Sequence, residues 1–308
     1  MRRVLIVVLG LAALAGCSAG GAPTAATPVP ASGTAFEQAL ARMDGPFGGR
    51  VDFVDSHALG EAAAAGGPWE QLVGGTGGSL DTYRGPLADV LGIDLARADM
   101  LVATGNPPQR VTLVAGGQDE ERVRAAAAAA GWTGDGDLHH DFTVEQPLSI
   151  VAGALRPRGA DVVVGGPEAT LDLVDGSGPT LAQDAPVAAI TNCLGDVVVG
   201  VVTGGATPDG PLRGVGLRRD PAAPAGPPLT VLCVVGDSTT ATTVEDAVRT
   251  GTSLRTGEPY AQYLADPRVE QLPGSPPLVR MTAQTPPGGP TTFVLQALES
   301  GDLPGLAE

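Results

Sequence analysis

The sequence predicts an α+β fold built from two similar sheet-plus-helix halves. Its apolar segments alternate between short strand-like runs and longer runs with helical periodicity. A strand-like run at 111–117 precedes a helical segment at 118–130, and the same pair recurs 118 residues later at 229–236 and 238–255. In each copy the strand ends in glycine and a polar turn follows the helix. We therefore expect two halves of the same architecture, and the repeat suggests a duplication.

The first half is expected at residues 35–150. Phe36, Leu40 and Met43 fall on one face of a helix, and Ser56 is placed to cap the next helix. The expected elements are a helix at 36–43, a strand at 50–54, helices at 58–65 and 83–91, a hairpin with strands at 100–104 and 110–114, and the repeated strand and helix.

The second half is expected at residues 151–308. Pro186 falls in the first turns of a long helical segment, where its missing N–H is tolerated. A breaker-rich connector at 222–228 precedes the repeated pair. The expected elements are a strand at 161–165, a helix at 181–199, the repeated strand and helix, a strand at 278–283 and a final strand or helix at 291–299.

Residues 1–16 have the pattern of a secretory signal peptide. Arg2 and Arg3 provide positive charge, and the apolar run Val4–Ala15 follows them. A transmembrane helix needs about 20 apolar residues, so this run is too short to span a bilayer. We expect the segment to be removed on export, which leaves the rest of the chain extracytoplasmic.

Leu14, Ala15, Gly16 and Cys17 resemble the lipobox of bacterial lipoproteins. The resemblance implies that Cys17 becomes the first residue, carries diacylglycerol and holds the protein on the outer face of the cell membrane through acyl chains such as palmitate. Two acyl chains anchor durably, whereas one anchors marginally. Residues 17–34 would then be the lipidated cysteine and an uncharged Ala/Pro/Thr tether. A secreted protein with a coincidental cysteine is the alternative.

Charge and composition disfavour nucleic acid and anionic membrane surfaces as partners, and also ligands that need stacked aromatic rings. The formal net charge is −16, and it becomes −18 if Arg2 and Arg3 leave with the signal peptide. An acidic surface repels nucleic acid and anionic headgroups, so we expect no nucleic-acid partner and membrane attachment through lipid alone. Aromatic residues make up only 3% of the chain, which argues against a site built on stacked rings.

The remaining cysteines form an even pair. With Cys17 lipidated in an oxidising compartment, Cys193 and Cys233 are expected to form a disulfide. The alternatives are two buried small hydrophobic side chains, one in a helix and one in a strand, or a catalytic thiol. No histidine follows His140 to activate a thiol.

One segment, Val231–Thr239, resembles the first block of GDSL-type esterases, in which a Gly-Asp-Ser turn delivers a nucleophilic serine. That chemistry requires a histidine C-terminal to the serine, and none follows Ser238. The block also lies far toward the C-terminus, whereas the family has it near the start. We therefore interpret Ser238 as a helix N-cap.

Two further motifs have structural interpretations. The glycine-rich Gly74–Ser79 could cradle a phosphate, but the chain contains no Lys and no convincing strand precedes the motif, so we expect a flexible loop. A cluster of acids and histidines could bind Ca²⁺ or Zn²⁺ but is interpreted as a solvated acidic turn. Its members are Asp135, Asp137, His139, His140 and Asp141.

The chain as a whole is similar to uncharacterised cell-surface lipoproteins of actinobacteria, which combine a lipobox, a tether and an α+β body with a cysteine pair. The resemblance implies an envelope location without an activity. Because no complete catalytic constellation is present, we expect a non-catalytic protein that binds a small molecule or an envelope protein, without a cofactor or metal. The alternatives are an esterase-like envelope hydrolase using Ser238 or Asp237, and a purely structural surface component.

Overall fold

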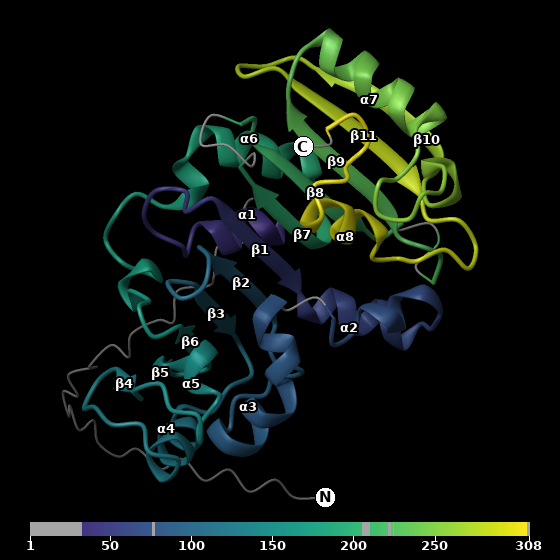
Figure 1. Cartoon of the computed structure of the whole chain (residues 1–308). Helices are drawn as coiled ribbons and strands as arrows, with labels where there is room; N and C mark the ends of the chain where they lie inside the picture. Colours follow the sequence, from purple (N-terminus) through teal and green to yellow (C-terminus); the bar gives the residue numbers. More distant parts are fainter. Residues whose placement is uncertain (1–32, 76–77, 205–209, 221–222, 224, 307–308) are drawn as a thin grey trace, which may run out of the picture. The chain divides into compact units, whose positions relative to one another are not determined.

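The fold is organised around one antiparallel sheet of eleven strands (Figure 1). A computed structural model of the chain describes residues 33–75, 78–204, 210–220, 223 and 225–306. Across the sheet the strand order is β10-β11-β9-β8-β7-β1-β2-β3-β6-β5-β4. The strands are β1 (Arg50–Asp55), β2 (Met100–Thr104), β3 (Val111–Ala115), β4 (Leu138–His139), β5 (Ala154–Arg158), β6 (Asp161–Gly165), β7 (Val197–Thr203), β8 (Arg213–Arg218), β9 (Leu229–Val235), β10 (Ala265–Leu272) and β11 (Leu278–Gln284).

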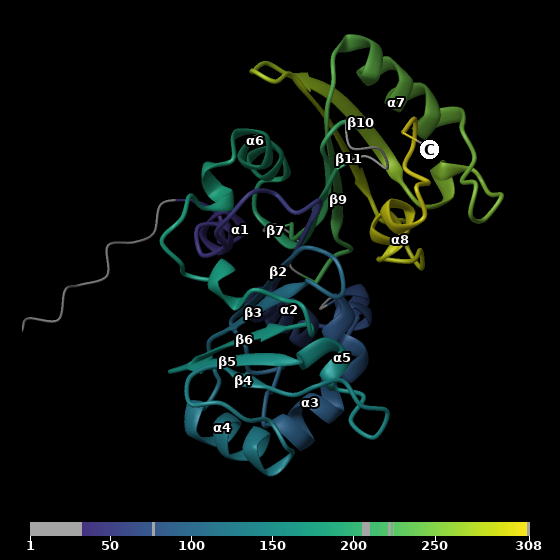
Figure 2. The same ribbon diagram turned by 60° about the vertical axis from the view of Figure 1, so that its left-hand side comes forward.

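Helices cover both faces of the sheet. The α-helices are α1 (Ala35–Leu40), α2 (Ser56–Ala64), α3 (Arg84–Leu91), α4 (Glu120–Ala129), α5 (Ser149–Ala152), α6 (Ala185–Leu194), α7 (Ser238–Thr250) and α8 (Phe293–Glu299). Short 3-10 helices are η1 (Gly67–Leu72), η2 (Gly78–Tyr83), η3 (Leu171–Leu173), η4 (Leu181–Gln183) and η5 (Tyr260–Gln262). Figure 2 shows α1 and α6 on one side of β7 and α8 on the other.

Two apolar cores follow from this layering. The core under α1 and α6, called the α6 face, includes Phe36, which stacks on Phe53 with ring centroids 4.6 Å apart. The core under the other α-helices, called the α8 face, is mainly aliphatic and also buries Trp69 and Trp132. Because both faces are covered, the central strands bury side chains of both alternating sets.

The strands run through the sheet in two series of the same order. β1, β2 and β3 are neighbours, and the chain returns after α4 to place β6 beside β3 and β5 beside β6. Likewise β7, β8 and β9 are neighbours, and the chain returns after α7 to place β11 beside β9 and β10 beside β11. The two series join where β1 pairs with β7 in antiparallel register.

These observations confirm the α+β class and most of the expected elements, with corrections in the second half. The expected helix at 181–199 is too long. In the structure η4 is followed by α6, which ends at Leu194. Gly195 has a φ of 68°, and β7 follows. A residue at positive φ ends a helix, and glycine adopts that conformation without strain. The final element at 291–299 is a helix, α8.

The N-cap of α2 differs from the prediction by one residue. Asp55 caps α2 by accepting a hydrogen bond from the Ala58 N–H at 2.8 Å, so Ser56 is the first helical residue. Thr34, the last residue of the predicted tether, caps α1 in a capping box with Glu37. Where Asp and Ser are adjacent, sequence alone does not decide between them, because both side chains accept the same backbone donors.

Candidate functional site

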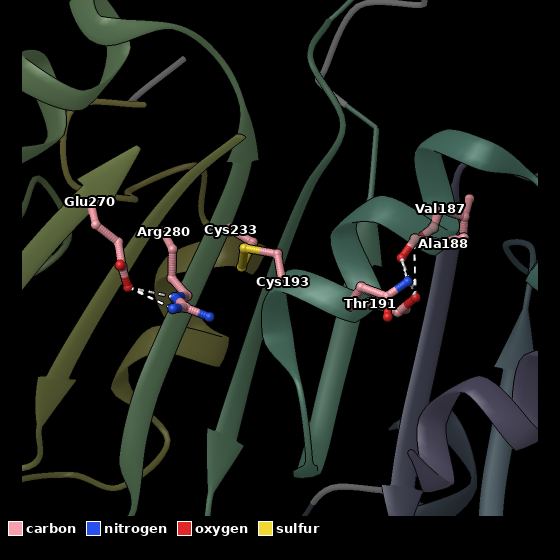
Figure 3. The surroundings of a disulfide bond; sticks show 8 residues. Val187, Ala188, Thr191, Cys193, Cys233, Glu270 and Arg280 are labelled. Atoms are coloured by element: carbon pink, nitrogen blue, oxygen red, sulfur yellow. Dashed lines mark hydrogen bonds and ion pairs between the residues drawn. A yellow bond between two sulfur atoms is a disulfide. The ribbon is translucent and has the colours of Figure 1, made fainter. Parts of the chain in front are cut away.

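The predicted disulfide is present and links helix α6 to the sheet that it covers (Figure 3). Cys193 lies in the last turn of α6 and Cys233 lies in β9, with their Cα atoms 6.1 Å apart. Both cysteines are buried. The pair therefore fastens α6 covalently onto the sheet, and neither thiol is available as a nucleophile.

The predicted lipidation site cannot be placed in this fold. Cys17 and the predicted signal peptide lie outside the described residues, as does most of the predicted tether. Among the helices of the described part of the chain, none is long and apolar enough to cross a bilayer.

Among the described residues, Ser238 has no catalytic partner. Asp237 caps α7, accepting hydrogen bonds from the Thr239 and Thr240 N–H groups at 2.9 and 3.1 Å, so Ser238 is the first helical residue and not the predicted cap. Ser238 follows the C-terminal end of β9, and His57 follows the C-terminal end of β1. Because β1 and β9 run in opposite directions, His57 and Ser238 lie at opposite ends of the strands. His139 lies in β4, eight strand positions from β9, or about 40 Å along the sheet.

The acidic and histidine cluster is not assembled as a metal site. Asp137 accepts two hydrogen bonds of 2.6 Å from the Arg156 guanidinium. The ring of His140 packs against Trp132 at a centroid distance of 4.4 Å, and His139 pairs through its backbone with Thr133. Within the described residues no group of three or more His, Cys, Asp or Glu side chains could hold a metal ion. The glycine-rich loop at 74–79 falls partly outside those residues, and η2 begins at Gly78.

A cavity of about 350 Å³ opens on the α8 face, at the end of the sheet where β2 turns into β3. Figure 2 shows α5, which forms part of its wall, beside β5 and β6. Its lining is mostly apolar and includes the prolines of the β2–β3 turn. The lining residues are Thr82, Tyr83, Pro107, Pro108, Arg110, Thr112, Ile150, Val151 and Gly166.

Arg110 connects this cavity to a buried ion-pair network. Its Nη2 donates to Asp52 at 2.6 Å, and the same carboxylate accepts bonds of 2.6 to 3.1 Å from Arg50. Arg50 also pairs with Glu299 of α8. In the register, Ala103 lies between Asp52 and Thr112, and its small side chain leaves room for Arg110 to reach across β2.

The network sets the charge state of Asp52. Burial raises the pKa of this carboxyl, but the guanidinium groups of Arg50 and Arg110 outweigh burial and hold the pKa below its ordinary value. Asp52 therefore stays ionised and pairs with both Arg50 and Arg110. The Nε of Arg110 is buried and has no hydrogen-bond partner among the described residues.

A second, smaller cavity of about 200 Å³ lies on the same face at the β1–β7 junction. Arg50 and Asp52 line it from β1, Val199 and Val201 line it from β7, and Glu299 lines it from α8. The ion-pair network therefore stands between two cavities. Arg110 faces the larger one and Arg50 the smaller.

We compared the chain with protein-family models, curated proteins and solved structures. None of them matches it.

The cavity residues were not predicted as functional from the sequence. Arg50 and Asp52 alternate with Val51 and Phe53, which is the pattern of a strand with one face in water. The only signal of a buried ion pair was the opposite charge of Arg50 and Asp52 on a strand that helices cover on both faces. Sequence alone could not show this, because it does not assign the covering helices to the faces of the sheet. Ile150 and Tyr83 carried no signal beyond their apolar character.

Another buried carboxylate, Asp302, has a structural role. It accepts hydrogen bonds from the Ser253 hydroxyl at 2.5 Å, the Leu254 N–H at 2.8 Å and the Tyr260 hydroxyl at 2.8 Å. Burial raises the pKa of Asp302, but these donors together lower it below its ordinary value. Its acceptor capacity is used within the fold, where it ties the chain after α8 to the loop after α7.

Proposed function

We propose that this protein is a lipid-anchored extracytoplasmic binding protein without catalytic activity, and that the cavity beside Arg110 is its ligand site. The observation that carries the proposal is the convergence of an apolar wall and one guanidinium on a cavity of about 350 Å³. Volumes of about 300 to 1,000 Å³ with few polar groups are typical of small-molecule sites. The pattern at residues 14–17 supports the lipid anchor.

We also propose that the body arose by duplication, with the boundary between β6 and α6 and not after residue 150 as the sequence predicted, because β5 and β6 belong to the first strand series. On the α8 face, Val54, Leu101, Val114 and Val162 are successive partners across β1, β2, β3 and β6. Their counterparts across β7, β8, β9 and β11 are Val201, Val215, Leu232 and Met281, again all in one core. The same offset of 118 residues that relates Val114 to Leu232 relates Arg110 to Pro228, so the second half has no guanidinium at the position of Arg110.

The anchor is tested by substituting the modified residue. Cells expressing the full chain are expected to incorporate radiolabelled palmitate into it and to retain it in the membrane fraction. Cys17→Ala is expected to abolish both, because no other thiol at the expected N-terminus can accept diacylglycerol. Label that persists in Cys17→Ala, or an unlabelled wild-type chain, would refute the anchor.

The ligand site is tested by thermal unfolding of the full chain in phosphatidylcholine nanodiscs against a panel of anionic, cationic and neutral small molecules. A ligand at 100 times its Kd should raise the Tm by about 5 °C, because binding to the folded state adds roughly 2.7 kcal/mol. Ile150→Glu should remove the shift, since Ile150 lines the cavity and is 44% exposed.

The matched control is Val144→Glu, which adds the same charge at a side chain that is 84% exposed and does not line the cavity. This variant should keep the wild-type shift. If no compound raises the Tm, or if shifts survive in Ile150→Glu, the cavity is not the ligand site.

A further inference from the structure

We propose that the cavity beside Arg110 takes a small monocarboxylate with an apolar body. This inference rests on the proposed function and names the ligand class for the same site.

The lining separates into an apolar wall and a polar floor. Tyr83, Ile150 and Val151 come from the helical layer, and Pro107 and Pro108 come from the β2–β3 turn. Ile150 is 44% exposed, although it is a large aliphatic side chain beside a concave surface. Covering it with an apolar ligand body removes hydrophobic area from water, which favours binding in proportion to the area buried.

The floor carries the charge. Arg110 and Thr112 project from the same side of β3, two residues apart. Arg110 is the only charged residue in the lining, in a chain of net charge −16. An anion in the cavity therefore meets a cation without an acidic neighbour in the wall, and a guanidinium recognises the planar carboxylate group through paired N–H donors.

The network limits the ligand to one negative charge. Asp52 is shared by Arg110 and Arg50, so it neutralises only part of the Arg110 charge, and Glu299 pairs with Arg50 on the far side of the network. A single partly neutralised guanidinium suits a monoanion. A dianionic phosphate monoester would need a second cation, and no other Arg lines this cavity.

The volume limits the size. At roughly 30 Å³ per group, the share of one water molecule in the liquid, the cavity of about 350 Å³ holds about a dozen non-hydrogen atoms. A carboxylate on a body of about nine carbons fills it. The compound 4-phenylbutanoate has this size, and 4-phenylbutan-1-ol provides the same body without the charge.

The test is isothermal titration calorimetry of both probes against the full chain in phosphatidylcholine nanodiscs, with empty nanodiscs subtracted. We expect 4-phenylbutanoate to bind one per chain and the alcohol to bind at least about 10-fold more weakly, because a hydrogen bond to a charged group is lost. Arg110→Gln should weaken the acid by about 10-fold or more and leave the alcohol unchanged. Ile150→Glu should weaken both probes, and Val144→Glu should weaken neither.

The outcomes separate this inference from the function on which it rests. Equal affinity for the two probes, with both lost in Ile150→Glu, would overturn the carboxylate assignment and keep the cavity as a binding site. Failure of both probes to bind would also overturn the assignment, while the compound panel decides the binding function independently. If Arg110→Gln does not fold, the acid-to-alcohol ratio and Ile150→Glu still decide the matter.

Discussion

Replacing both cysteines of the disulfide, as Cys193→Ala with Cys233→Ala, is expected to lower the free energy of unfolding by about 4 kcal/mol. The bond joins residues 40 apart in sequence, and closing a loop of that length removes about this much conformational freedom from the unfolded chain. The loss of two buried sulfur atoms acts in the same direction. Urea unfolding at pH 7 measures the difference, and the m-value should rise because the uncrosslinked unfolded chain is more expanded.

The control for this prediction is the wild-type chain unfolded with and without reductant. Reductant should destabilise the wild type to the level of the double variant and leave the variant unchanged. Because both cysteines are buried, alkylation of the native chain with iodoacetamide and reductant should require unfolding. A double variant within about 1 kcal/mol of the wild type would show that α6 stays on the sheet through packing alone.

The sequence predicted this link because an expected export to an oxidising compartment, with Cys17 expected to be lipidated, leaves Cys193 and Cys233 as one pair. It also placed Cys193 in a helix and Cys233 in a strand, and α6 and β9 confirm both placements. What it did not predict is where that helix ends and β7 begins. The run from Leu181 to Val199 is apolar enough for a helix or for a strand covered on both faces, and periodicity does not separate the two. Gly195 marks the boundary, and its role becomes visible only through its positive φ.

The repeated strand and helix were predictable because each copy is continuous in sequence. The sheet order was not, because β6 and β11 return to pair with β3 and β9 after long connections. The candidate site depends on that order: Asp52 and Arg110 are 58 residues apart and meet only because β2 lies between their strands. A site assembled from neighbouring strands therefore gives no local motif, unlike the Gly-Asp-Ser turn that drew attention to Ser238.

The largest expected effect of a single substitution is at Asp52. Asp52→Asn is expected to lower the free energy of unfolding by about 3 to 5 kcal/mol at pH 7, because two guanidinium groups lose the carboxylate that neutralises them. The Asp52 and Arg110 side chains are each 11% exposed, so water replaces the lost partner poorly. Asp172→Asn is the matched control. It also removes a carboxylate that pairs with an arginine, but its side chain is 81% exposed and the change should stay within about 0.5 kcal/mol.

The pH dependence of the same variant gives an independent check. The pKa of Asp52 is held below its ordinary value in the folded chain, so its contribution to stability is complete above about pH 4, the unfolded pKa, and is lost as the pH falls through the folded pKa. The difference between wild type and Asp52→Asn should therefore be constant from about pH 5 to 7 and shrink below about pH 4. A difference that is already small at pH 7, or one that grows on acidification, would show that the two arginines do not depend on Asp52 and that Arg110 is held in the cavity by other contacts.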